Sequence, residues 1–455
     1  MSSSRSNKIL VISYVFPPVQ DAHAFRVGDL VHQWIADGHQ VEVVTGWAPG
    51  LARTEHADGL VIHRVGGLTE GLRALLGKRS LAIVPPDSAK PAARRSHGKR
   101  GQSLLRIAKA AVMAMYAATW RRVYWPDAVC AWYLPASRMA RRLARQGSYS
   151  LLFSYCPHFT AHLVALGLMS RKNIPRWVAD YGDPFSCVDD MPPNNYALYR
   201  RLNRAAERRV FARADRVTVT CEGTRRLYSS AFPEHAAKIE VIPHHVSLDS
   251  APREEEPAIF PADTINFVYA GSLHRGVRDP RRLIALFSRW LDRNPERRSR
   301  AVLHFFGRYD GFEELVEATR SANIVFHGHV PRDLVRSALN QASIIVNIGN
   351  QTSYQMPSKL GDLVKMGRPI LNVASIEEDT SAWFLRRYPL LLNLRVPAEV
   401  SAAHVLALET FVNSQMGQRL SRAEVLDLLD EYRIERIAAR YLAADTPLER
   451  DREIA

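Results

Sequence analysis

Residues 356–371 (MPSKLGDLVKMGRPIL) carry side chains that could bind a phosphorylated ligand. Pro357 suits the first turn of a helix, because a proline lacks only an N–H that has no partner there, and apolar residues follow at helical spacing. The positive end of such a helix, at Pro357, Ser358 and Lys359, would attract an anion, and the carboxylate of Asp362 would accept hydrogen bonds from hydroxyl groups. The pattern predicts a site for a nucleotide diphosphate and its ribose. An ordinary surface helix with Lys359 paired to Asp362 fits the same residues.

A basic loop in the same half of the chain could bind the same kind of ligand. Residues 265–270 have the pattern of a buried strand, and Gly271, Arg275 and Arg278 follow in a glycine-containing loop. Arginine forms paired hydrogen bonds with phosphate oxygens. Arginines and a helix end would supply the positive charge that a diphosphate requires. No Asp-x-Asp pair, which could hold a metal ion, stands near these loops. We therefore expect no metal ion and no resident cofactor.

Two polar motifs in the first half of the chain follow predicted strands. His158 comes shortly after the strand pattern of residues 150–155, and Asp183 shortly after that of residues 176–181. In a parallel sheet the carboxyl ends of the strands meet at one edge, where ligands bind. We therefore expect His158 and Asp183 to lie at the same edge as candidate catalytic residues. A structural role for the histidine fits the sequence about as well.

A strongly basic segment interrupts the first half. Residues 88–122 contain nine Lys or Arg and no Asp or Glu, and they run into an apolar helical pattern over residues 104–120. Cationic flanks and an apolar face are typical of a helix that lies on an anionic membrane, whereas a core helix with a solvated loop fits equally well. A nucleic-acid partner is not favoured, because no RNA-binding motif accompanies the charge. The predicted membrane contacts are Arg94, Arg95, Lys99, Arg100, Arg106, Lys109, Arg121 and Arg122.

Composition agrees with a globular protein that meets anionic partners. The 455 residues are 47% hydrophobic and carry a formal net charge of +15, a balance that favours phosphorylated ligands or an acidic membrane face. The four cysteines are scattered without a CxxC pair, so a reducing compartment fits best. No run of 18 uncharged apolar residues occurs. We expect a cytoplasmic location, with peripheral association at the inner face of the cell membrane as an option.

The order of elements predicts two α/β domains. Strand and helix patterns alternate from residue 8 and start again at residue 265, which implies parallel sheets with right-handed crossovers. The missing G-x-G-x-x-G fingerprint disfavours a nicotinamide enzyme. We predict two Rossmann-like domains facing across a cleft. Their expected bounds are 1–249 with an insertion at about 78–125, a linker at 250–263, a second domain at 264–425 and a C-terminal helix at 426–455. The pattern of residues 422–442 predicts one final amphipathic helix.

The whole chain resembles the retaining, nucleotide-sugar-dependent glycosyltransferases of family 4, which have the GT-B fold. It looks closest to bacterial members that build surface polysaccharides. The matching motifs, in order, are Phe16-Pro17-Pro18 with Arg26, Gly38-His39-Gln40-Val41, Trp125-Pro126-Asp127, residues 154–158 and 180–185, Glu207 with Ala214-Asp215, Val241-Ile242-Pro243, Tyr269-Ala270-Gly271 with Arg278-Asp279-Pro280, Gly328-His329-Val330 and residues 357–371.

The resemblance implies roles for several residues. Asp362 would hold the ribose of the donor, Arg278 or Arg275 would contact its diphosphate, and His158 would lie beside the transferred sugar. It also implies a hexosyltransferase that acts without a metal on a lipid-linked or polysaccharide acceptor, with the leaving phosphate helping to deprotonate the acceptor hydroxyl. A sugar-nucleotide epimerase or hydrolase on the same fold, or a non-catalytic relative that binds sugar nucleotides, is the alternative.

Three positions depart from the family pattern. The loop at residues 19–24 lacks the usual Gly-Gly pair, Gly182 replaces an arginine that is common before Asp-Pro, and Tyr354 stands where the family has its first acidic residue. These changes bear on the identity of the donor and on whether the chain is active.

Overall fold

The computed structural model describes residues 7–19, 21–66, 119–169, 176–190, 192–248 and 257–443. These residues form two compact units, each described here by itself: unit 1, made of Met1–Pro243 and Ile434–Ala455, and unit 2, made of His244–Arg433. Most of the predicted insertion, from residue 78 to residue 118, lies outside the described residues. Among the residues described, no helix is both long and apolar enough to cross a membrane.

Unit 1 is built on a sheet to which the described residues contribute eight strands, in the order β3-β4-β2-β1-β5-β6-β7-β8. All neighbours are parallel except β3 and β4, which pair antiparallel. The strands are β1 (Lys8–Ile12), β2 (Gln40–Gly46), β3 (Thr54–Ala57), β4 (Leu60–Val65), β5 (Leu151–Cys156), β6 (Trp177–Tyr181), β7 (Arg216–Val219) and β8 (Ile239–Val241). Strands β5 and β6 are buried along their whole length, as expected for parallel strands covered on both faces.

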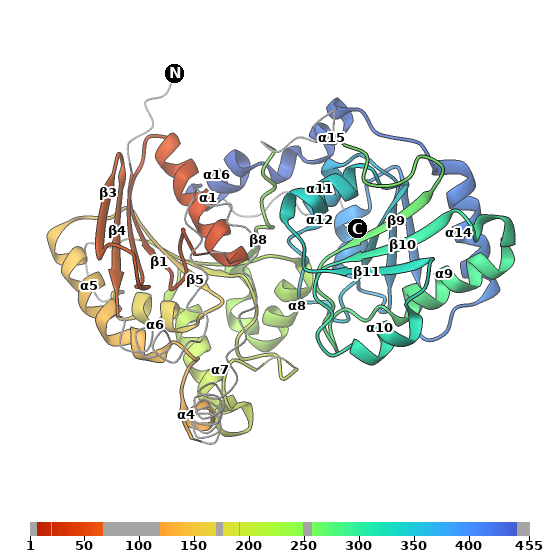
Figure 1. Ribbon diagram of the computed structural model, residues 1–455. Helices are drawn as coiled ribbons and strands as arrows, with labels where there is room; N and C mark the ends of the chain where they lie inside the picture. The colour runs from red at the N-terminus through yellow and green to blue at the C-terminus, as the bar shows by residue number, and fades with distance from the viewer. Residues whose placement is uncertain are drawn as a thin grey trace, which may run out of the picture. The chain divides into compact units, whose positions relative to one another are not determined.

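Helices cover both faces of this sheet (Figure 1). Helices α1 (Ala22–Ala36) and α16 (Ile434–Leu442) pack on one face, where Trp34 lies against Phe153 and Tyr441. The other face carries α5 (Tyr133–Gln146), α6 (Thr160–Leu166), α7 (Tyr196–Arg213) and α8 (Glu222–Ala231). Short helices occur at α4 (Trp120–Val123), η1 (Cys130–Trp132) and η2 (Pro233–Lys238).

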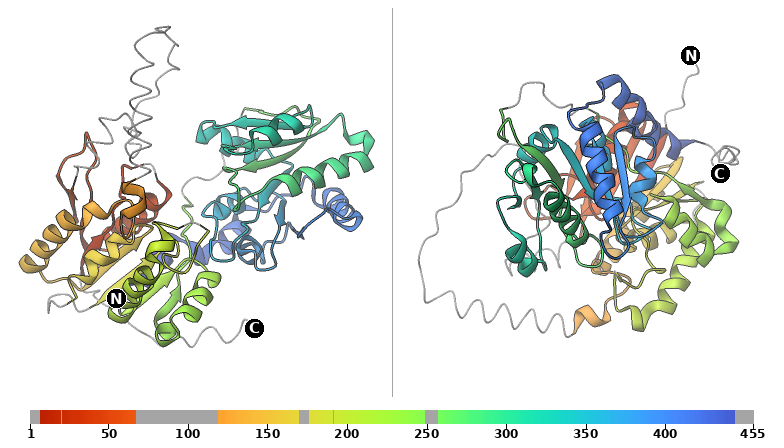
Figure 2. Two further views of the ribbon diagram at one scale, coloured as in Figure 1. Left: turned by 90° about the horizontal axis from the view of Figure 1, so that it is seen from below. Right: turned by 90° about the vertical axis from the view of Figure 1, so that its right-hand side faces the viewer.

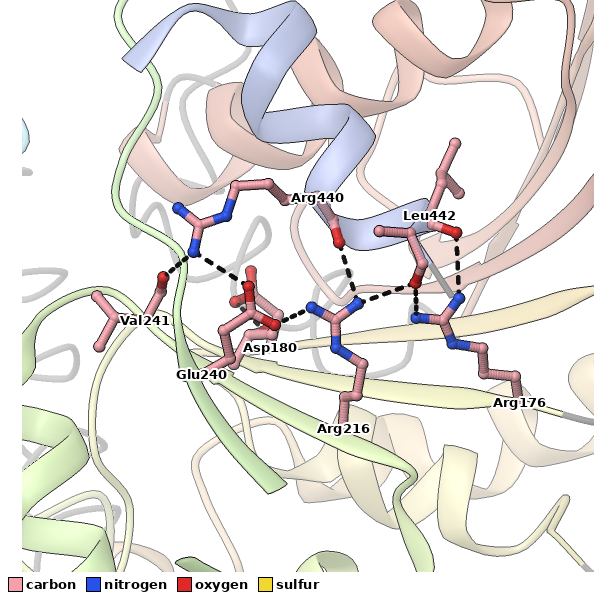
Figure 3. A network of polar contacts seen from close by, with 9 residues as sticks. Arg176, Asp180, Arg216, Glu240, Val241, Arg440 and Leu442 are labelled. Atoms are coloured by element: carbon pink, nitrogen blue, oxygen red, sulfur yellow. Dashed lines mark hydrogen bonds and ion pairs between the residues drawn. The ribbon is translucent and has the colours of Figure 1, made fainter. Parts of the chain in front are cut away.

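Arginines hold helix α16 on unit 1 (Figure 3). Arg176 and Arg216 donate hydrogen bonds to carbonyl oxygens at the end of α16, at 3.0 to 3.3 Å. Arg440 donates to Glu240 at 3.0 Å, and Glu240 also pairs with Arg216. The last carbonyls of a helix have no partner within the helix, so these arginines satisfy the end of α16 and fix it to β6, β7 and β8.

A second, fully buried cluster attaches the same helix to α1. Arg26 lies 3.4 Å from the carboxylate of Asp180 and donates to the hydroxyl of Tyr441 at 2.7 Å and to the carbonyl oxygens of Ile242 and Pro243 at 3.2 and 3.1 Å. Arg26 and Asp180 are 3% and 0% exposed. Burial raises the pKa of Asp180, and Arg26 opposes the rise. Arg26 therefore joins α1 both to α16 and to the segment where the chain leaves unit 1.

Unit 2 has a parallel sheet of six strands within the described residues, in the order β11-β10-β9-β12-β13-β14. Its strands are β9 (Ile265–Ala270), β10 (Ala301–Phe306), β11 (Ile324–Gly328), β12 (Ile344–Ile348), β13 (Ile370–Ala374) and β14 (Leu391–Arg395). Helices also flank this sheet in the two further views of the structure (Figure 2). They are α9 (Arg281–Arg293), η3 (Pro295–Arg297), α10 (Glu313–Thr319), α11 (Arg332–Asn340), α12 (Leu360–Lys365), α13 (Thr380–Leu385), α14 (Ala402–Gln415), α15 (Arg422–Leu428) and η4 (Asp430–Tyr432).

The predicted fold class, α/β with two parallel-sheet domains, is confirmed, but the predicted bounds need correction. Unit 1 ends at Pro243 rather than at residue 249, and unit 2 already contains residue 246, whose backbone N–H donates to the carbonyl of Tyr432 at 2.8 Å. The predicted helix over 422–442 is three pieces, because Arg433 is extended and the chain passes from unit 2 to unit 1 there. The break lets Tyr432 pack on Phe384 in unit 2.

Candidate functional site

The carboxyl edge of the unit 1 sheet carries the predicted catalytic residues. His158 follows β5 and Asp183 follows β6, and these strands are parallel neighbours, so the expected placement at one edge is confirmed. The ring of His158 packs edge-on against that of Tyr14 with centroids 4.9 Å apart. Strand β1 is the other neighbour of β5, and the chain that follows it leads into helix α1 at the same edge.

His23, in the first turn of α1, is the direct partner of Asp183. Its Nε2 atom lies 3.6 Å from the carboxylate of Asp183, and its Nδ1 atom lies 2.8 Å from the hydroxyl of Tyr155. Burial keeps the pKa of Tyr155 well above its ordinary value, although Arg26 opposes the rise, so this hydrogen bond joins His23 to a neutral phenol. Where Tyr155 donates to Nδ1, a neutral His23 carries its proton on Nε2, which faces Asp183. The side chains of His23 and Asp183 remain 27% and 38% exposed, so both can be reached by a ligand.

Gly182 makes this arrangement possible. A Cβ atom at this position would lie 2.6 Å from the hydroxyl of Tyr155 and 3.1 Å from Nδ1 of His23. Any side chain there would have to displace one of these two groups. The departure from the family pattern at Gly182 is therefore matched by the histidine in the loop that lacks the Gly-Gly pair.

A buried carboxylate positions the loop that carries His158. Asp127 is 3% exposed and accepts hydrogen bonds from the backbone N–H and the hydroxyl of Thr160, both at 2.8 Å. It also accepts from the backbone N–H of Val129 at 3.0 Å. Asp127 thus satisfies a free donor at the start of α6, two residues after His158.

A second buried carboxylate positions the loop that carries Asp183. Glu207, on α7, accepts hydrogen bonds from the backbone N–H of Ser186 at 3.2 Å, from the Ser186 hydroxyl and from Tyr228 at 2.6 Å. Tyr228 in turn accepts from the backbone N–H of Phe185 at 2.9 Å. Burial raises the pKa of Glu207 to about 7, against these hydrogen bonds. Two residues found through the family resemblance, Asp127 and Glu207, therefore act as supports of the edge.

The carboxyl edge of the unit 2 sheet brings together two of the predicted donor-binding cations. Lys359 donates to the carbonyl of Ala270 at 2.7 Å, and its Nζ lies 4.2 Å from the centre of the Tyr269 ring. Arg278 donates to the side chain of Asn350 at 2.8 Å. Burial, and then the charge of Arg278, hold the pKa of Lys359 well below its usual value. The two positive groups are thus close enough to repel each other, which is the environment that an anion would relieve.

Gly271 is required for this approach. Its φ of 149° lies in the region that favours glycine, and a Cβ atom would meet Nζ of Lys359 at 2.8 Å. The prediction of Gly271 as a site residue therefore has a steric basis in the position of Lys359.

Other predicted donor contacts are placed differently from expectation. The helix begins at Leu360 and not at Pro357, so Pro357, Ser358 and Lys359 form the turn before it. Helix α12 has six residues, and the positive charge at this edge comes from side chains rather than from a long helix.

Asp362 and Arg275 contact groups other than Lys359 and Arg278. Asp362 is 60% exposed and pairs with Lys365 at 2.7 Å, whereas the surface-helix reading had paired it with Lys359. Arg275 donates to the carbonyl of Gly311 at 2.6 Å and is exposed. Their assigned roles, and those of His158 and Asp183, stay predictions.

The sequence did not predict a site role for His23, Tyr155, Tyr269 or Asn350, although Tyr155 and Tyr269 lie in motifs that match the family. Only the tertiary structure pairs His23 with Asp183, across 160 residues of chain. The available signal was its place after the first strand, in the loop that departs from the family pattern.

The metal and membrane expectations stay predictions. No group of three or more His, Cys, Asp or Glu side chains that could hold a metal ion occurs among the residues that the structure describes. Of the predicted membrane contacts, Arg94, Arg95, Lys99, Arg100, Arg106 and Lys109 lie outside the described residues, as does the side chain of Arg121. Arg122 is exposed.

Comparison with known proteins defines the class. Residues 24–250 match the family model described as Glycosyltransferase Family 4, so unit 1 carries a glycosyltransferase family 4 domain. This confirms the predicted family at the level of the domain. No match to a curated protein sequence is found.

Solved structures identify the fold. Sucrose-phosphate synthase from Thermosynechococcus elongatus is similar at 16% identity and a TM-score of 0.55, over 96% of this chain and 97% of that chain. The UDP-forming trehalose-phosphate synthase from Burkholderia vietnamiensis is similar at 13% identity and a TM-score of 0.56, over 96% of each chain. A UDP-forming trehalose-phosphate synthase from Burkholderia xenovorans, in complex with glucose-6-phosphate, is similar at 11% identity and a TM-score of 0.57, over 96% of this chain and 99% of that chain. The chain has the GT-B fold of these glycosyltransferases, as predicted.

Proposed function

We propose that this chain transfers a sugar from a nucleotide-sugar donor to a lipid-linked or polysaccharide acceptor, with retention of anomeric configuration and without a metal ion. The observation that carries the proposal is the pair of cations, Arg278 and Lys359, at the carboxyl edge of the unit 2 sheet in a GT-B fold. Open parallel sheets bind ligands at this edge.

Unit 2 would bind the donor. A diphosphate beside Arg278 and Lys359 would replace the repulsion between two like charges by attraction to both. The same contacts would grow stronger as the sugar–phosphate bond breaks, because negative charge then collects on the diphosphate. Asp362 would accept hydrogen bonds from the ribose, for which it would exchange its contact with Lys365.

Unit 1 would bind the acceptor and the transferred sugar. Asp183 accepts hydrogen bonds when ionised, and Nε2 of His23 can exchange one with a hydroxyl group, so the pair can orient the hydroxyl groups of a sugar. His158 would lie beside the anomeric carbon. The hydroxyl that attacks would lose its proton to the departing phosphate, so the reaction needs no protein base in this scheme.

The first test is a donor screen. The purified chain is mixed with a panel of UDP-, GDP-, ADP- and dTDP-sugars, and the thermal unfolding midpoint is recorded, since a ligand that binds only the folded state raises it. The donor found is then incubated with candidate lipid-linked acceptors, and release of the nucleoside diphosphate is measured. Release without an acceptor would identify a hydrolase or epimerase, and no release with any donor and acceptor would contradict transfer.

Variants connect the result to the site. Lys359→Met and Arg278→Met each remove one charge-assisted contact, and we expect donor affinity to fall by about ten- to one-hundredfold. The matched control is Arg300→Met, in unit 2 but at the amino end of β10, where its side chain donates to the carbonyl of Asp263. Unchanged donor affinity in both site variants would refute the assignment of the donor edge.

A further inference from the structure

Helices α4 and α7 share an exposed surface that combines apolar and arginine side chains. We call it the α4–α7 surface, formed by Arg122, Val123, Leu198, Arg201, Leu202 and Arg209. Val123, Leu198 and Leu202 are 54%, 60% and 43% exposed. They are three of the eight large apolar side chains that are exposed among the described residues.

Hydrogen bonds fix the two helices to each other. The hydroxyl of Tyr199 donates to the carbonyl of Val123 at 2.7 Å, and the side chain of Asn195 donates to the carbonyl of Arg122 at 3.2 Å. Asn195 also caps the first turn of α7. Val123 and Leu198 therefore belong to one folded surface.

The periodicity of α7 separates its outer face from its core face. Its buried residues are Asn203, Ala206, Glu207, Val210 and Phe211. Leu198, Arg201, Leu202, Ala205 and Arg209 recur at spacings of three and four, so they share the opposite face, and all are exposed.

The charge of this face is of one sign. Helix α7 contains six arginines and one carboxylate, and that carboxylate, Glu207, is fully buried. Arg204 and Arg208 reach neighbouring elements, through the carbonyl of Ala231 and the side chain of Glu234. Arg201 and Arg209 lie on the outward face with Leu198 and Leu202 between and beside them.

We propose that the α4–α7 surface docks on an anionic membrane, with its arginines at the lipid headgroups and its leucines at the boundary of the acyl chains. Charge alone would also attract nucleic acid, but single-strand binding uses aromatic stacking on the bases, and the side chains between these arginines are leucines. The inference rests on the proposed function in one respect, because this surface would bring the chain to an acceptor that lies in the membrane. Vesicle binding itself requires no turnover.

The experiment is vesicle co-sedimentation of the full chain. Vesicles of phosphatidylcholine alone are compared with vesicles that contain about one third phosphatidylglycerol. Two double variants test the surface: Arg201→Glu/Arg209→Glu changes its charge, and Leu198→Ser/Leu202→Ser removes its apolar part at constant charge. The matched controls change equally exposed residues of unit 2, namely Arg320→Glu/Arg422→Glu and Leu406→Ser. Thermal unfolding of each variant verifies that it is folded.

Docking predicts that the wild type and both controls pellet with anionic vesicles and not with phosphatidylcholine. The arginine variant is expected to lose about tenfold or more in apparent vesicle affinity, and the leucine variant to lose affinity although its charge is unchanged. Failure of the wild type to pellet, or equal pelleting of both surface variants and the controls, would overturn the proposal. The proposal would also be overturned if the wild type bound single-stranded RNA and no vesicles, and if only the arginine variant lost the RNA binding. The thermal-shift response to nucleotide sugars is expected to be the same in all variants, so a failure of docking is distinguishable from a failure of the proposed transfer.

Discussion

Replacing Arg26 is expected to destabilise unit 1 and to release helix α16. The variant Arg26→Met leaves Asp180 in a fully buried position with only its remaining hydrogen bonds, of which that from Thr218 at 2.7 Å is one. Breaking a buried ion pair by removing one partner costs about 3–5 kcal/mol. Burial already favours the neutral form of Asp180, and the carboxyl can take up a proton when Arg26 is gone. We therefore expect the lower end, about 3 kcal/mol.

The double variant Arg26→Met/Asp180→Asn tests the cause. If the uncompensated carboxylate is the main cost, the second substitution recovers about 1–2 kcal/mol of unfolding free energy. A cost that came only from the lost contacts with Tyr441 and with the Ile242 and Pro243 carbonyls would not be recovered.

Two measurements give the answer. Urea unfolding reports the free energy, and deuterium uptake of the peptide covering Ile434–Leu442 reports whether α16 opens locally. Arg64→Met is the matched control, because Arg64 has the same 2% side-chain exposure and an ion pair in unit 1, but its recorded partners are Glu55, Ala52 and Pro17. Destabilisation below about 1 kcal/mol, additive effects in the double variant, or unchanged uptake in α16 would refute the reasoning.

Four further outcomes are expected. The pKa of Glu207 is raised from 4.5 to about 7 in the folded chain, so the folded state binds this proton more tightly than the unfolded state. The resulting stabilisation is full below about pH 4.5 and is lost as the pH rises through about 7. Relative to Glu207→Gln, the wild type should lose about 2.5 kcal/mol of unfolding free energy between pH 5 and pH 8 in urea titrations, and a constant difference would contradict the shift. Donor binding should be accompanied by proton uptake, because a diphosphate would raise the depressed pKa of Lys359. Calorimetry in buffers of different ionisation enthalpy measures this, and the same uptake in Lys359→Met would exclude the lysine. Gly271→Ala should weaken donor binding by displacing Lys359, with normal binding as the contrary result. His23→Phe should lower kcat/KM by about tenfold in the nucleotide-release assay, because the polar group that faces Asp183 is lost. An unchanged value would remove His23 from the site.

Local pattern was sufficient for most strands but not for the C-terminal part of the chain. The apolar runs at residues 265–270 and 370–374 coincide with β9 and β13, because a strand covered on both faces is apolar along its length. Strand β14, of mixed exposure, was not predicted. The helical pattern of residues 422–442 is continuous and does not predict the break at Arg433. The helix is interrupted there because Tyr432 packs on Phe384 in the core of unit 2, whereas Tyr441 packs on Phe153 in the core of unit 1.

The sequence by itself determined the class of fold, the edge at which each candidate residue lies and the family of the unit 1 domain. The class of fold and the edge follow from the alternation of strands and helices along the chain and from the rule that the carboxyl ends of parallel strands meet at one edge. The family follows from the order of its motifs. Only the tertiary structure decided which side chains meet. It placed His23 between Asp183 and Tyr155, made Asp127 and Glu207 supports of the edge, and directed Lys359 to Ala270 while Asp362 pairs with Lys365. The physical reason is that such contacts depend on the register of strands and on the room left by Gly182 and Gly271, and neither is written in the local order of residues.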